Sequence, residues 1–345
     1  MKMKLLLGAG VCACLCAVLS CGCMRQESVH KIAGFAQGSY YAVTYYTAQS
    51  ALSAEKLQPA VDSLLQAFDL CASLWKENSE ICRVNRNEDF APSEMFCDMF
   101  DKAQQVSQLT GGAFDITVSP LVKLYGFSKK DKTEADGKAG TLREEELSEI
   151  LRFVGWEKVR IENGRVVKSD ARLQLDFNAI AQGYASDLVS RMLDSLGISR
   201  YLVDVGGEIR ARGRKPNGDR WVVGIEKPAG NAMDDRVVMT RMYLENQSLV
   251  TSGNYRKYFE ENGKRYSHTI DPKTGRSVQH NLLSATVLCR DCWEADALAT
   301  ACMVLGVDSA QAFLLRHADR YEGFLIYADS TGLCTWHTEG FPLAD

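Results

Sequence analysis

The chain has 345 residues, a net charge of −4, and 46% hydrophobic against 24% charged residues. This balance is typical of a globular protein, and the length allows one large domain or two ordinary ones. The slightly acidic composition argues against a nucleic-acid partner, which usually requires a basic stripe. No internal repeat indicates a solenoid or a propeller.

Residues 1–20 have the pattern of a secretory signal peptide. Lys2 and Lys4 precede the apolar run LLLGAGVCACLCAVLS, which is too short for a comfortable membrane span. The cysteine after VLS resembles the lipidated residue of bacterial lipoproteins, which favours Cys21, while SCGC leaves Cys23 open. The alternative is a plain cleaved signal. Either way we expect a mature protein outside the cytoplasm, with residues 21–32 as a short tether and a catalytic domain over residues 33–345.

The next segments predict helices and hairpins in mixed order. Residues 35–47 alternate aromatic and small side chains like a strand. Ser53 and Ser93 are expected to cap two amphipathic helices, the second ended by Gly111-Gly112. Thr141 and Glu144 form a capping box for a further helix, and Asn163-Gly164 predicts a hairpin.

The second half of the chain continues in the same way. LQLDF, residues 173–177, predicts a strand that leads into a helix capped by Asn178. Further strands are expected over 201–213, 221–228 and 282–289, with a hairpin at Asn262-Gly263, a helix over 293–306, a short helix and a terminal hairpin. Because strict β-α-β alternation is missing, we predict a single α+β domain with mixed, largely antiparallel sheets flanked by helices.

Asp296 and Thr300 are the first candidate for a chemical site. They are four residues apart on a predicted helix, so they share a face amid alanines. A carboxylate and a hydroxyl there offer the hard oxygen ligands that Mg²⁺ or Ca²⁺ prefer. The structural alternative is an acidic first turn with a threonine that bonds back to a carbonyl.

Other candidates are ambiguous when taken alone. Asp176 and Asn178 stand at a predicted helix start, where free N–H groups bind anions. Gly111-Gly112 with Asp115 would admit a flat ligand, although a plain helix end explains them too. His268 lies at the expected end of a hairpin, before the rigid Asp271-Pro272 turn. Cys289 and Cys292 form a lone C-x-x-C, which could be a redox pair but is more often two small buried residues.

The order of these segments along the chain is specific. GGAFDITVSPLVKLYGF, LDFNAIAQGYASD, DVGGEIRARG, VTSGNYRKYFEENGKRYSHTIDPKTG and ADALATA closely resemble five blocks of the FAD:protein FMN transferases, the ApbE family. The similarity runs from about Gly34 to the final hairpin. It implies an ApbE-type, T-fold-like domain that transfers FMN from FAD to a threonine of an acceptor flavoprotein and releases AMP.

The resemblance also implies roles for individual residues. Asp296, Thr300 and the carbonyl of Ala179 match the family's Mg²⁺ ligands, and His268 matches a histidine needed for activity. Ala113, Phe114, Asp115 and Asp176 match residues that contact FAD. Gln182 departs from the pattern, since the family usually has a lysine there that faces the flavin nucleotide; the amide can still donate but carries no charge.

Two rival activities and a set of partners follow from the same resemblance. Water in place of threonine would make the chain a FAD pyrophosphatase that yields FMN and AMP, and a non-catalytic flavin-binding lipoprotein is the alternative from another class. The family modifies periplasm-facing subunits of membrane redox complexes, such as sodium-pumping NADH:quinone oxidoreductases and Rnf-type complexes. We therefore expect a lipid-anchored, periplasm-facing enzyme.

Overall fold

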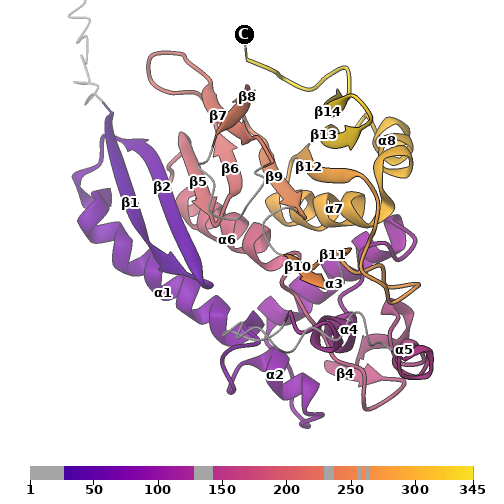
Figure 1. Ribbon diagram of the computed structural model, residues 1–345. Coiled ribbons are helices and arrows are strands. Elements are labelled where there is room, and N and C mark those ends of the chain that lie inside the picture. The colour runs from indigo at the N-terminus through magenta and orange to yellow at the C-terminus, as the bar shows by residue number, and fades with distance from the viewer. Residues whose placement is uncertain (1–26, 128–142, 229–236, 255–257, 262–263, 345) are drawn as a thin grey trace, which may run out of the picture.

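The computed structural model describes residues 27–127, 143–228, 237–254, 258–261 and 264–344 (Figure 1). The predictions for residues 1–20, Cys21, Cys23, Thr141 and the Asn262-Gly263 turn lie outside these residues. Within them, no helix combines the length and the apolar character that crossing a membrane requires.

The first half of the chain forms a hairpin, five α-helices and a second, smaller hairpin. Its elements are β1 (Ser28–Ala36), β2 (Ser39–Thr47), η1 (Ser50–Leu52), α1 (Ala54–Ala72), α2 (Glu80–Asn85), α3 (Glu94–Leu109), α4 (Ser119–Leu124), α5 (Glu144–Leu151), η3 (Trp156–Lys158), β3 (Val159–Glu162) and β4 (Arg165–Lys168).

The second half supplies most of the main sheet and its central helices. Its elements are α6 (Ala181–Ser195), β5 (Tyr201–Val205), β6 (Glu208–Arg212), β7 (Trp221–Glu226), β8 (Val238–Leu244), β9 (Ser248–Gly253), β10 (Tyr258–Glu261), β11 (Lys264–Ser267), β12 (Leu282–Cys289), α7 (Cys292–Leu305), α8 (Val307–Arg316), β13 (Glu322–Asp329) and β14 (Gly332–His337).

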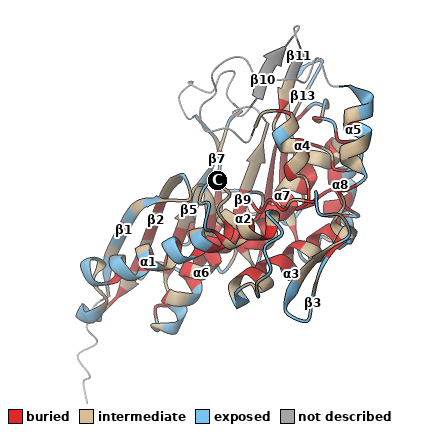
Figure 2. Cartoon of the chain, turned by 90° about the horizontal axis from the view of Figure 1, so that it is seen from below, coloured by how far each residue is buried: buried red, intermediate tan, exposed pale blue. Residues whose placement is uncertain are grey.

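Eight strands form one sheet in the order β1-β2-β5-β6-β9-β12-β13-β14, and every neighbouring pair is antiparallel. Helices α1, α6, α7 and α8 pack on this sheet, and the main core lies between the two layers (Figure 2). The β7–β8 hairpin encloses a smaller apolar cluster with Ile209 and Phe324. This architecture confirms the predicted α+β class.

Helix α7 is buried on almost every side. Its interior positions include Leu298, Cys302 and Met303 together with four alanines. A helix that is apolar all round is stable only inside a protein, and α7 indeed contacts β9, β12, α3, α6 and α8. Asp296, the buried acid of α7, is therefore held in an apolar, rigid setting.

Four local predictions were wrong. Residues 201–213, predicted as one strand, form the antiparallel strands β5 and β6. Residues 173–177 join no sheet; instead the Asn85 side chain donates to Leu175 O at 2.9 Å and accepts from Leu175 N at 2.7 Å, which replaces a neighbouring strand. Asn178 does not cap the following helix, because α6 begins at Ala181 after Ile180. Residues 28–32, predicted as part of a tether, form the start of β1.

The seven cysteines of the described residues carry free thiols. Cys289 and Cys292 are both buried, and burial raises the pKa of each thiol well above its ordinary value. A reactive thiol needs a lowered pKa and access to solvent. The interpretation of this pair as buried packing residues therefore agrees with the structure.

Candidate active site

Helices α6 and α7 meet at Gly183. A Cβ atom on this residue would lie 2.7 Å from Asp296 Cβ and would collide with the carbonyl oxygen of Cys292, so only glycine fits. The Gly183 N–H donates to Asp296 Oδ2 at 2.9 Å. Two segments that are more than a hundred positions apart in the sequence are thus joined, and Asp296 is held against the first turn of α6.

This contact changes the start of α6. In a regular helix the Gly183 N–H would donate to the carbonyl of Ala179, four residues earlier. Because it donates to Asp296 instead, none of the backbone hydrogen bonds of the described residues ends on the Ala179 oxygen. The Ala179 carbonyl therefore keeps its capacity to accept at the start of α6, next in the chain to the segment that contacts Asp296.

Thr300 lies one helical turn after Asp296, on the same face of α7 as the sequence predicted. Its hydroxyl oxygen is 3.3 Å from Ser252 Oγ on β9. Burial raises the pKa of Asp296, and the single N–H from Gly183 only partly opposes this effect. A carboxylate in this setting is stabilised by a nearby cation.

The donor set fits a hard cation. Asp296 supplies a carboxylate, Thr300 a hydroxyl and Ala179 a free carbonyl, and Mg²⁺ prefers such oxygen ligands. Over the described part of the chain, no three histidine, cysteine or acidic residues gather as metal ligands. A metal site here would therefore use oxygen atoms of mixed origin rather than an all-acidic cage.

Gln182 packs on the glycine turn between β5 and β6. Its amide nitrogen occupies the place of a Cβ on Gly206, so a side chain at Gly206 would clash with it. The φ of Gly206 is +72°, which also disfavours any residue other than glycine. The neighbouring Gly207 N–H donates to Asp204 Oδ1 at 2.9 Å. The predicted DVGGE and AIAQG segments are thus brought together.

A cleft of about 300 Å³ adjoins this region. Residues from the α1–α2 connection, α2, α4 and the 174–178 segment line it, including Trp75, Lys123, Phe127 and Asp176. Asp176 Oδ1 accepts from Asn178 N at 2.8 Å. Burial raises the pKa of Asp176 despite this bond. Residues 176–183 therefore connect the cleft directly to the Gly183–Asp296 contact.

The 111–115 segment supports the cleft from within the core. Ala113 and Phe114 are buried in the main core. Asp115 Oδ1 accepts from both the N–H and the hydroxyl of Thr117 at 2.7 Å, and its Oδ2 accepts from Trp156 N at 2.8 Å. The carboxylate thus fixes local backbone, and contact of these three residues with FAD stays a prediction.

His268 directly follows β11, as the sequence predicted. Its ring lies edge-on to Phe127, with 6.3 Å between the ring centroids, which places it beside the cleft that contains Asp176. Asp271 accepts from Lys273 N and Thr274 Oγ1, each at 2.9 Å, so the carboxylate closes its own turn. The Lys273 side chain of this turn reaches Gly112, since its Cε would lie 3.8 Å from a Cβ built on that glycine.

Several lining residues carried no sequence signal. Trp75, Asn85 and Arg86 belong to the α1–α2 region, and a six-residue helix such as α2 leaves too short a periodic pattern to be predicted. Trp75 is half exposed at the cleft. Exposed aromatic rings next to a cleft offer a surface on which a flat ring can stack.

The chain is similar to a known protein family and to curated members of it. Residues 37–325 match the model of the ApbE family. A FAD:protein FMN transferase from Haemophilus influenzae is 33% identical over 342 residues, which cover 96% of both chains. Another from Vibrio cholerae is 35% identical over 325 residues, covering 91% of this chain and 95% of the relative.

Solved structures agree with these relatives. The flavin transferase ApbE from Vibrio cholerae superposes with a TM-score of 0.80 at 31% identity, over 91% of this chain and 98% of that chain. The apo flavinyl transferase ApbE from Pseudomonas stutzeri gives a TM-score of 0.80 at 33% identity, over 92% and 96%. The family match over residues 37–325 includes both the residues that line the cleft and the α6–α7 contact.

Proposed function

Because the chain belongs to the ApbE family and is a flavin transferase that moves FMN from FAD to protein, we propose how this site performs the transfer. The acceptor is a threonine hydroxyl. Its oxygen forms a bond to the phosphorus of the FMN half of FAD, the pyrophosphate P–O bond breaks, and AMP leaves with the bonding electrons.

One observation carries this proposal: the Gly183 N–H donates to the buried Asp296 instead of to the Ala179 carbonyl, which accepts no backbone hydrogen bond among the described residues. Asp296, Thr300 and Ala179 hold Mg²⁺ in the proposal. When bound, Mg²⁺ neutralises the charge of the pyrophosphate and of the leaving group. Burial of Asp296 on α7 keeps its carboxylate at a fixed position.

His268 takes the proton of the acceptor hydroxyl in this proposal. A neutral imidazole is a suitable base near pH 7. Its place beside Phe127 at the cleft supports this role, as does the turn closed by Asp271, which fixes the backbone after it.

The cleft holds FAD in the proposal. Trp75 offers an exposed ring for stacking, and Lys123 supplies a cation near Asp176. Gln182, at the start of α6, donates a neutral amide to the nucleotide where relatives usually place lysine. We expect weaker FAD binding from this exchange rather than a different reaction.

The acceptor and the location are further parts of the proposal. The signal-like start supports export and a lipid on Cys21, which would bring the enzyme to periplasm-facing subunits of membrane redox complexes. Cys21→Ser should release the protein from the membrane fraction. Lipidation that persists in this variant would transfer the role to Cys23, and lipid on neither cysteine would end the anchor proposal.

The decisive experiment incubates the protein with FAD and Mg²⁺, with and without a candidate acceptor domain. Intact-mass analysis should show the acceptor gaining one FMN, while chromatography should show AMP released in equal amount. Rapid release of free FMN when no acceptor is present would favour the pyrophosphatase instead. An unmodified acceptor and intact FAD would contradict both activities.

A further inference from the structure

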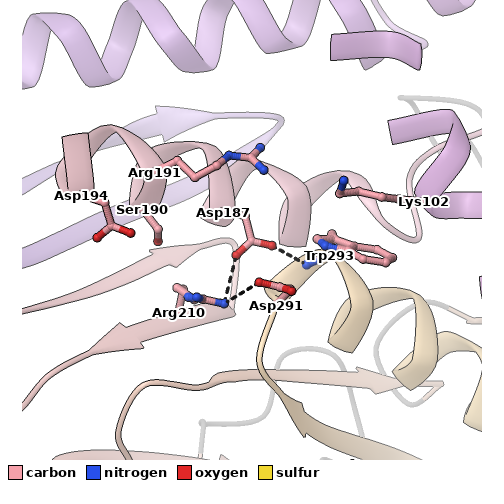
Figure 3. A pocket seen from close by; sticks show the side chains of 8 residues that line it. All are labelled: Lys102, Asp187, Ser190, Arg191, Asp194, Arg210, Asp291 and Trp293. Atoms are coloured by element: carbon pink, nitrogen blue, oxygen red, sulfur yellow. Dashed lines mark hydrogen bonds and ion pairs between the residues drawn. The ribbon is translucent and has the colours of Figure 1, made fainter. Parts of the chain in front are cut away.

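A second cavity, of about 230 Å³, lies between α3, α6, β6 and the start of α7 (Figure 3). Asp187 of α6 points into it and faces Arg210 of β6 and Asp291, which precedes α7. None of these residues belongs to the cleft or the metal ligands described above. The cavity therefore raises the question of what a buried carboxylate does at this place.

Asp187 caps a helix other than its own. Its carboxylate is only 4% exposed, and Oδ2 accepts from the backbone N–H of Trp293 at 2.9 Å, in the first turn of α7. The N–H groups of a helix's first turn have no partner within the helix, and Asp291, at the N-cap position of α7, makes no capping bond with its side chain. Asp187 supplies the missing acceptor from α6.

A cation holds Asp187 in this position. Arg210 Nη1 lies 3.5 Å from Asp187 Oδ1 and 3.2 Å from Asp291 Oδ1. Burial raises the pKa of Asp187 to about 6, and the charge of Arg210 opposes this rise most strongly. The Arg210 charge thus compensates a carboxylate whose second oxygen is used by α7.

The two helices brace each other in opposite directions. Asp187 of α6 accepts from the first turn of α7, and Asp296 of α7 accepts from Gly183 in the first turn of α6. On each helix the two braced positions are three or four residues apart, which is about one turn, or about 5.4 Å of rise. A shift at the start of α7 therefore moves Asp296 relative to Ala179.

We propose that Asp187 is a positioning residue for the metal ligand Asp296. It fixes the first turn of α7 on α6, so that the Asp296 carboxylate and the Ala179 carbonyl stay at the separation that a bound cation requires. The inference rests on the proposed function, because it assumes that these atoms bind a metal. Mg²⁺ tolerates little deviation from its preferred geometry, so loosening one brace should weaken binding.

The test measures Mn²⁺ binding to the metal-free, full-length protein by calorimetry, with no substrate present. Asp187→Leu removes the acceptor and should weaken Mn²⁺ binding at least tenfold. Asp187→Asn retains an oxygen that accepts from Trp293, so its affinity should stay within about threefold of the wild type. Should Asp187→Leu fail to fold, Asp187→Ser, whose side chain is too short to reach Trp293, takes its place with the same expectation.

Asp194→Leu is the matched control. Asp194 lies on the same helix and lines the same cavity, but it contacts Tyr201 and Arg212 rather than α7. Its loss should leave Mn²⁺ affinity unchanged. Equal weakening by Asp194→Leu, or unchanged affinity in Asp187→Leu, would overturn the positioning role. A wild-type protein that binds no Mn²⁺ would instead contradict the metal site of the proposed function, which separates the two failures.

Discussion

The Asp296→Asn variant should be more stable than the wild type in the absence of metal, and less stable than the wild type once Mg²⁺ is added. Without metal, the wild type buries a carboxylate that has one N–H partner, Gly183. Burial raises the pKa of Asp296 above its value in the unfolded chain, so the charged form penalises the folded state at pH 8, above the unfolded pKa. The asparagine of the Asp296→Asn variant keeps the shape and the acceptor without this charge.

The stability gained by removing the buried charge and the stability that bound Mg²⁺ adds to the wild type are similar in size, so the reversal should be measurable. Relieving an incompletely paired buried polar group is worth about 1–3 kcal/mol. Mg²⁺ at a hundred times its Kd stabilises the wild type by about 2.7 kcal/mol. With an unfolding entropy near 2.1 cal/mol/K per residue, 345 residues give about 0.7 kcal/mol/K. Without metal, the melting temperature of the variant should therefore be about 1–4 °C above that of the wild type. Adding Mg²⁺ should raise the melting temperature of the wild type alone, by about 4 °C.

The assay is thermal unfolding of both proteins at pH 8, after chelation and after addition of Mg²⁺. Ca²⁺-free buffer with matched ionic strength controls for general salt effects. An equal rise in the melting temperature of both proteins on adding Mg²⁺ would remove Asp296 from the metal site. A metal-free variant that melts several degrees below the wild type would refute the argument from buried charge.

The remaining predictions concern three other residues. His268→Ala should keep FAD affinity within about tenfold, or ~1.4 kcal/mol, yet slow flavin transfer by about a hundredfold or more. As a control, His317→Ala should transfer flavin normally, because the His317 ring packs with Phe313 outside the matched blocks. Near-normal transfer by His268→Ala would exclude a proton-transfer role. Gly183→Ala places a methyl group against α7, so this variant should be about 1–3 kcal/mol less stable than the wild type. Mg²⁺ should also no longer stabilise it, and thermal unfolding measures both effects. The pKa of Asp187 is about 6 in the folded protein, above the ordinary 3.8. The free energy of unfolding of the wild type, relative to Asp187→Asn, should therefore fall by about 2 kcal/mol as the pH rises from about 4.5 to 7.5. Denaturant titrations measure this difference, and a difference that is independent of pH would show that Asp187 titrates normally.

Long periodic patterns allowed much of the fold to be predicted. The buried faces of α1 and α3 follow the expected spacing, with Leu57, Val61 and Phe68 on one and Phe96 and Phe100 on the other. The β3–β4 hairpin lies at Asn163-Gly164, and both residues have positive φ as that turn requires. These features depend on residues close in sequence, which is why local patterns suffice.

Elements stabilised by distant contacts were missed. The LQLDF segment alternates like a strand, but the side chain of Asn85 takes the place of a neighbouring strand, and nothing in the segment itself reveals that partner. Strand β1 begins at Ser28 because β2 pairs with its full length. Tertiary context overrides local propensity in both cases.

The candidate site shows the same division between local and distant information. The spacing of Asp296 and Thr300 on one helix was readable from the sequence. The Ala179 carbonyl could be named only from the family resemblance, because its freedom depends on a close approach that only the absence of a side chain at Gly183 permits. The role of Asp187 has no local signal either, because its partner Trp293 lies more than a hundred positions later in the chain.

The four buried aspartates of this region differ in how many hydrogen-bond and ion-pair partners their carboxylates have within the protein. Asp115 accepts from Thr117 and Trp156, and Asp187 is held by Trp293 and Arg210, so both oxygens of each are engaged within the protein. Among the described residues, Asp296 accepts from Gly183 N, while Asp176 accepts from Asn178 N and has the Asn178 side chain as a further partner. A buried carboxylate with an unused oxygen is costly unless something else binds it. Asp115 and Asp187 therefore brace the backbone, while Asp296, with the fewest partners within the protein, is the acid that the proposed cation would stabilise most.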